Sequence, residues 1–152
     1  MKVVTALLRG PNFLSLIGRK TVKNSEIVWN RYPQDEPKKD GFYLVTISHY
    51  EDYVIVCDYS ATEKWSDSGV IAWAELPVPF GRSGRTGTQV DWHPYPDKKP
   101  DVWGIYLATA SIYEERDISV ILWLPSENKF FGEDEYHILA WAEMPEPYKE
   151  RL

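Results

Sequence analysis

The sequence contains one cysteine and no apolar run of about 18 residues, the length that a membrane-spanning helix needs. One cysteine excludes an internal disulfide and a zinc site built from cysteines. The first apolar stretch, residues 3–8, ends at Arg9 and is too short for the hydrophobic core of a signal peptide. We therefore expect a cytoplasmic protein with no membrane partner.

Aromatic residues and proline are plentiful. The 152 residues include 7 Trp, 10 Tyr, 11 Pro and 9 Gly, and 43% are hydrophobic. This length allows one ordinary domain or two small ones, and the hydrophobic content is that of a folded protein. So much proline and glycine works against long helices and favours short strands joined by turns.

The charge is unevenly distributed along the chain. The net charge is −6, made up of +4 in residues 1–26, −5 in 27–80, +2 in 81–90 and −7 in 91–152. Acidic surfaces repel nucleic acid and attract basic protein surfaces, so we expect no direct nucleic-acid partner. The simpler interpretation is that the excess of carboxylates keeps the protein soluble.

The chain contains an internal repeat. Residues 29–48 match residues 92–111 at an offset of 63, and residues 71–79 match residues 139–147 at an offset of 68. Most identical positions hold Trp, Tyr, Pro or Gly, which rarely match by chance. Duplication predicts that both copies share one fold.

Each copy has the pattern of three short strands. Stretches rich in β-branched and aromatic residues alternate with polar turns and end at prolines. The fold prediction is therefore mainly β: two repeated three-stranded antiparallel meanders packed together, with an extra N-terminal segment. The predicted divisions are a 1–26 N-terminal arm, a 27–79 first repeat, an 80–90 linker and a 91–148 second repeat.

Both copies open with the pattern W-x-x-Y-P-x-x-x-P and close with W-A-E-L-P-x-P or W-A-E-M-P-x-P. This combination resembles a family of short domains of unknown function found in phage and prophage accessory proteins. The resemblance covers residues 29–79 and 92–147. It implies a phage or mobile-element context and a small β-rich domain, and it implies no reaction.

The sequence offers few groups for catalysis or metal binding. His49, His93 and His137 have no metal-ligand spacing, and Cys57 lies within a predicted strand, where a buried inert thiol is the simpler interpretation. Glu75 and Glu143 occupy the same place in both copies, which leaves a paired-carboxylate site open. We predict a protein that is not an enzyme and holds no cofactor or metal.

The candidate binding residues are aromatic or charged. We treat nine aromatic residues as differing between the copies and therefore as free to contact a partner: Tyr50, Tyr53, Trp65, Trp103, Tyr113, Trp123, Phe130, Phe131 and Tyr136. Trp103 is expected in an exposed turn. The predicted binding set is Tyr50, Trp103, Tyr113, Glu114, Glu115, Glu133, Asp134, Glu135, Arg82 and Arg85.

Two functions remain open. The first is a protein-binding module that inhibits a host defence or nucleic-acid enzyme, because exposed aromatic residues among carboxylates make good anchors for protein interfaces. The second is a small-molecule binder with an aromatic cleft between the copies, where Arg82 or Arg85 would bind the phosphate of a nucleotide signal. The oligomeric state stays open.

Overall fold

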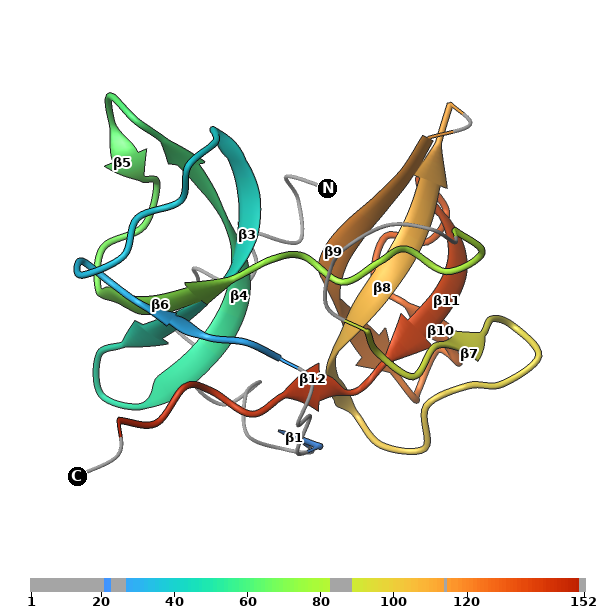
Figure 1. Cartoon of the computed structure of the whole chain (residues 1–152). Helices are drawn as coiled ribbons and strands as arrows, with labels where there is room; N and C mark the ends of the chain where they lie inside the picture. The colour runs from blue at the N-terminus through green and yellow to red at the C-terminus, as the bar shows by residue number, and fades with distance from the viewer. Residues whose placement is uncertain (1–20, 23–26, 83–88, 114, 151–152) are drawn as a thin grey trace.

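The protein folds into two curled β-sheets (Figure 1). The computed structural model describes residues 21–22, 27–82, 89–113 and 115–150. Within these ranges every regular element is a strand, which confirms the mainly β prediction. The two five-stranded antiparallel sheets come from the two predicted repeats, one sheet from each.

Both sheets have the same strand order. The first sheet, in the order β2-β6-β3-β4-β5, comprises β2 (Asn30–Arg31), β3 (Gly41–Ser48), β4 (Asp52–Ser60), β5 (Lys64–Trp65) and β6 (Val70–Ala74). The second, in the order β7-β11-β8-β9-β10, comprises β7 (His93–Pro94), β8 (Gly104–Ile112), β9 (Glu115–Leu124), β10 (Lys129–Phe130) and β11 (His137–Ala142). Identical connectivity is the structural result expected from duplication.

The strand order differs from a simple meander. The three long strands of each copy form as predicted, but the third pairs with the first instead of the second. The short strands β5 and β10 explain this difference, because they occupy the free edges of β4 and β9. The last long strand must then add to the opposite edge of the sheet.

Aromatic contacts curl each sheet toward closure. Tyr32 follows the edge strand β2, yet its ring meets that of Trp65 on the opposite edge strand β5, with centroids 5.9 Å apart. In the second sheet Tyr95 meets Phe130 in the same way at 5.0 Å. These edge-to-face pairs bring the two sheet edges together and enclose the apolar interior of each repeat.

The repeated tryptophans hold the loop that precedes the first long strand. The indole N–H of Trp73 donates to the carbonyl of Asp35 at 3.0 Å, and that of Trp141 donates to the carbonyl of Lys98 at 2.9 Å. The same atoms make the same bond in each copy. This use explains why these residue types recur in the sequence.

The segment after each sheet crosses to the other repeat. The amide of Phe80 donates to the hydroxyl of Thr109 at 3.0 Å, and the amide of Tyr148 donates to the hydroxyl of Thr46 at 2.9 Å. Phe80 and Tyr148 correspond at the offset of 68, and the two threonines correspond at 63. The two crossing segments run in opposite directions between the lobes (Figure 1).

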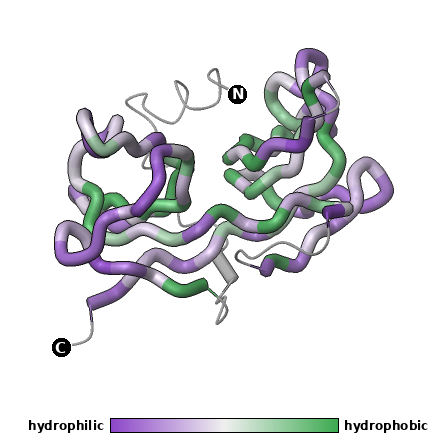
Figure 2. Tube along the Cα trace, turned by 45° about the horizontal axis from the view of Figure 1, so that its top comes forward, coloured by the Kyte–Doolittle hydropathy of each residue, from purple (hydrophilic) through white to green (hydrophobic). Residues whose placement is uncertain are grey.

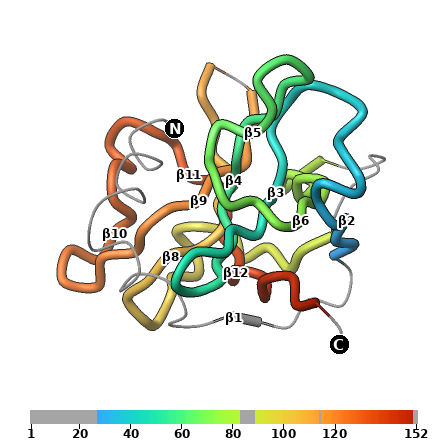
Figure 3. Tube along the Cα trace, turned by 90° about the vertical axis from the view of Figure 1, so that its left-hand side faces the viewer, coloured from blue at the N-terminus to red at the C-terminus, as the bar shows by residue number. Residues whose placement is uncertain are grey.

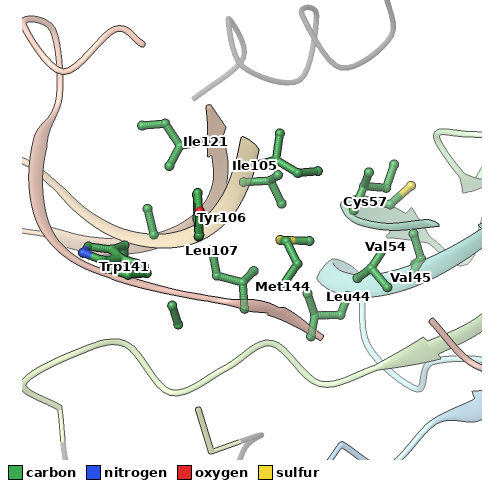
Figure 4. Close-up of a cluster of buried hydrophobic side chains, with 14 of the residues drawn as sticks. Leu44, Val45, Val54, Cys57, Ile105, Tyr106, Leu107, Ile121, Trp141 and Met144 are labelled. Atoms are coloured by element: carbon green, nitrogen blue, oxygen red, sulfur yellow. The ribbon is translucent and has the colours of Figure 1, made fainter. Parts of the chain in front are cut away.

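The two repeats share one hydrophobic core. Leu44 and Leu107, which occupy equivalent positions, are both 0% exposed, and Met144 is 4% exposed. Figure 4 shows Met144 between side chains of the two sheets. Hydrophilic residues gather in the outer loops and at the C-terminal end (Figure 2). Because β3 and β8 are covered on both faces, their sequences lack the alternation of a half-exposed strand.

One short pairing lies outside the duplication. Strand β1 (Thr21–Val22) pairs in parallel with β12 (Met144–Pro145), the start of the second crossing segment. The rest of the predicted N-terminal arm lies outside the described residues, as do residues 83–88 of the predicted linker.

Candidate functional site

Among the residues that the structure describes, two tyrosines at hairpin ends are the most exposed large hydrophobic side chains. Tyr50, between β3 and β4, is 92% exposed, and Tyr113, between β8 and β9, is 95% exposed. Both belong to the predicted binding set. They lie apart, because the two hairpins end at opposite sides of the molecule (Figure 3).

The treatment of these tyrosines as different between the copies is wrong. Tyr50 and Tyr113 match at the offset of 63, within the segments S-H-Y-E-D and S-I-Y-E-E. Each follows the end of the first long strand of its repeat. The signal was present in the sequence, two residues beyond the matched segment that ends at Ser48.

Carboxylates follow each tyrosine. Glu51 and Asp52 are exposed beside Tyr50, and Glu115 is exposed at the start of β9. Glu114, a predicted binding residue, lies outside the described residues. The nearest cation in the second hairpin, Arg116, is engaged elsewhere, because its guanidinium donates to the carbonyl of Phe80. Each hairpin end thus presents a phenol ring beside negative charge.

Glu133 supports the fold of the second repeat. Its Oε2 accepts a hydrogen bond from the hydroxyl of Tyr95 at 2.6 Å and another from the amide of Phe130 at 3.0 Å. Burial, and secondly the adjacent Glu133 carboxylate, raises the pKa of Tyr95. Sequence reasoning placed Glu133 at a binding surface, whereas the structure directs its carboxylate inward.

The neighbouring acidic residues point outward. Asp134 forms an exposed ion pair with Lys129 at 3.0 Å, and Glu135 is exposed. Only these two of the three predicted acidic residues in the β10–β11 loop face solvent. The side chain of Asp134 is 82% exposed despite this ion pair, so both carboxylates are accessible to a cationic partner.

Several aromatic candidates belong to the core. Trp123 is 2% exposed and Phe130 is 0% exposed, and their rings pack edge to face. Trp65 and Phe130 occupy equivalent strands, a match that a change in loop length hides from a fixed offset. Trp103 was expected in an exposed turn, but it is half-buried and packs against the core.

The space between the repeats holds apolar side chains where an aromatic cleft was expected. Leu44, Leu107 and Met144 are buried there. Arg82 is exposed at the end of the first crossing segment, and its amide donates to the carbonyl of Pro79. Arg85 lies outside the described residues.

The side chains considered for catalysis are either buried in the fold or lie beside a tyrosine of the same repeat. Cys57 is buried, with its Sγ 3.3 Å from the hydroxyl of Ser66, and burial raises the pKa of this thiol. Each glutamate of the predicted pair lies beside a tyrosine of its own repeat. Glu75 contributes, after burial, to the raised pKa of Tyr43, and Glu143 acts in the same way on Tyr106.

Within the described ranges, no group of three or more His, Cys, Asp or Glu side chains could hold a metal ion. Nor does that part of the chain contain a helix long and apolar enough to cross a membrane. Comparisons of the sequence with protein-family models and with curated proteins, and of the structure with solved structures, gave no match.

Proposed function

We propose that this protein is a non-enzymatic protein-binding module of a phage or prophage. It acts in the cytoplasm of the host cell and inhibits a host defence or nucleic-acid enzyme. The proposal rests on one observation above all: Tyr50 and Tyr113 are almost completely exposed beside carboxylates. Tyrosine is enriched at protein interfaces because its ring buries a large area at low entropic cost.

The charge of the chain supports a basic partner. The net charge is −6, and the carboxylates of Glu51, Asp52 and Glu115 are exposed beside the two rings. Enzymes that act on nucleic acid carry cationic channels, and an acidic surface is attracted to them. Blocking such a channel requires no catalytic group on the inhibitor.

The scaffold holds the hairpin ends in place. The ladders that carry them reach up to each tip, because Ser48 pairs with Asp52 and Ile112 pairs with Glu115. A ring presented by a rigid hairpin loses little conformational freedom on binding, which favours affinity.

The direct test is capture from host lysate with the tagged full chain. We expect a basic host protein to be retained by the wild type and lost when Tyr50 and Tyr113 are both replaced by Ser. The matched control is Phe42→Ser, which removes a ring that is 62% exposed but lies in β3, away from both hairpin ends. Equal capture by the wild type and the double variant would contradict the proposed surface.

A further inference from the structure

We infer that the two hairpin ends are equivalent docking sites, so that one chain binds two copies of the same cationic protein. This inference rests on the proposed function. It commits to one kind of occupant: a pocket that accepts a phenol ring and is rimmed by Lys or Arg side chains.

The first support is what the duplication has kept. The other aromatic residues identical in both copies are buried or half-buried, as Tyr43 and Trp73 illustrate with 7% and 8% exposure. Packing therefore explains why they recur. Tyr50 and Tyr113 are 92% and 95% exposed, so packing does not explain why this pair recurs. An exposed aromatic side chain kept at both ends is what a shared binding role requires.

The second support is the backbone at Tyr113. Its φ is +50°, in the left-handed region that is energetically costly for a bulky side chain. Glycine or asparagine is the usual residue at such a position in a turn. A tyrosine placed there despite the cost, with its ring in solvent, points to a role outside the fold.

The third support is the relation between the two ends. The reciprocal bonds of Phe80 to Thr109 and of Tyr148 to Thr46 relate the repeats by approximate two-fold symmetry. The hairpin ends lie on opposite sides of the molecule in two views (Figures 1 and 3). Because the two ends lie on opposite sides, each is open to its own partner copy, and two copies can bind at once.

The acidic residues set the charge of the partner. Glu51 and Asp52 follow one tyrosine and Glu115 lies two residues after the other, so both ends carry the same sign. The copies differ at the residue before the tyrosine, which is His49 in one and Ile112 in the other. We therefore expect the same partner at both ends, with different affinities.

The test uses the full chain in bacterial host cells, with a photoreactive phenylalanine analogue at position 50, 113 or 42. We expect irradiation to give an adduct with the same host protein at positions 50 and 113 and no adduct at 42. Different proteins at the two ends, no adduct at one end, or cross-linking to a second copy of this chain would overturn the inference.

The stoichiometry of the purified complex completes the test. Native mass measurement should give two partner molecules per wild-type chain and one for either Tyr50→Ser or Tyr113→Ser. The Phe42→Ser control should keep two. A one-to-one complex that persists in the double tyrosine variant would overturn bivalent docking and leave the protein-binding function standing. If neither this complex nor the lysate capture yields a partner, both proposals fail.

Discussion

The backbone amide of Tyr148 donates a hydrogen bond to the hydroxyl of Thr46 at 2.9 Å, across a separation of 102 residues. Its counterpart joins Phe80 to Thr109 at 3.0 Å. Each repeat therefore binds the crossing segment of the other, and both threonines are 0% exposed. This exchange binds the two halves of the chain into one unit.

Removing either buried hydroxyl should weaken the protein. Thr46→Val keeps the shape of the side chain but leaves the amide of Tyr148 without its partner, at a cost of about 1–2 kcal/mol in the free energy of unfolding. Thr109→Val should behave alike. Denaturant unfolding measures the effect, and Thr62→Val, at an exposed site, serves as the control. Equal stability of Thr46→Val and Thr62→Val would show that the bond contributes nothing.

Cutting the chain between the repeats should leave its halves together. We expect a protein carrying a protease site in place of residues 83–88 to elute as one species after cleavage. The crossing segment of each half stays bound to the other half through Thr109 or Thr46. Size-exclusion chromatography at micromolar concentration shows the result. Combining the cut with Thr46→Val and Thr109→Val should promote separation. Free halves from the cut wild type would contradict a shared core.

Replacing Glu133 should affect the free energy of unfolding far more than replacing Glu135, although both residues lie in one loop. Glu133→Ala removes the acceptor of two hydrogen bonds, from Tyr95 and Phe130, and should lower the free energy of unfolding by about 1–3 kcal/mol. Glu135→Ala, at an exposed position, should change it by less than about 0.5 kcal/mol. Thermal or denaturant unfolding of both variants decides the matter, and similar values would refute the structural role of Glu133.

The buried tyrosines should make the fold sensitive to alkali. Burial, with Glu143 and Asp101 as smaller causes, raises the pKa of Tyr106 from 10.0 to about 12. The folded state then holds the phenol proton more tightly than the unfolded state. Its stabilising effect is complete below pH 10.0 and is lost as the pH rises toward about 12. The free energy of unfolding of the wild type should therefore fall between pH 10.0 and about 12, whereas that of Tyr106→Phe lacks this contribution. The difference in the free energy of unfolding between the two proteins should shrink over this pH range. A difference that stays constant would contradict the raised pKa of Tyr106.

Tyr113 should show a conflict between stability and binding. Asparagine tolerates the left-handed backbone better than tyrosine, so Tyr113→Asn should raise the free energy of unfolding by about 0.5–1 kcal/mol. The same variant should lose the partner at that hairpin end. The matched control is Tyr50→Asn, because Tyr50 is equally exposed and its backbone does not have a positive φ. A stability loss in Tyr113→Asn would show that the ring serves the fold.

Much of the architecture could be predicted from the order of residues. The recurrence of Trp, Tyr and Pro at offsets of 63 and 68 indicates the duplication, because a repeated structure keeps the residues that build its turns and core. The β-branched and aromatic runs located the long strands. The pairing of the third strand with the first could not be predicted, because it depends on which sheet edge β5 and β10 leave free.

The candidate site was only partly predictable. The sequence predicts Tyr50 and Tyr113 as binding candidates, and their correspondence at the offset of 63 lies just beyond the matched segments. Glu133 and Trp103 have the residue types of a surface site, and only the folded chain shows one carboxylate bonded inward and one ring packed on the core. Loop-length changes concealed the equivalence of Trp65 and Phe130, because alignment at a fixed offset fails after an insertion.

The sequence by itself determined that one β-rich unit was copied, since local side-chain patterns set strand propensity and turn chemistry. Only the tertiary structure decided three features: the contact of each crossing segment with the other repeat, the burial of both faces of β3 and β8, and the exposure of Tyr50 and Tyr113. The physical reason is that exposure and hydrogen-bond partners depend on contacts between distant residues, and a pattern of neighbouring residues carries no record of them.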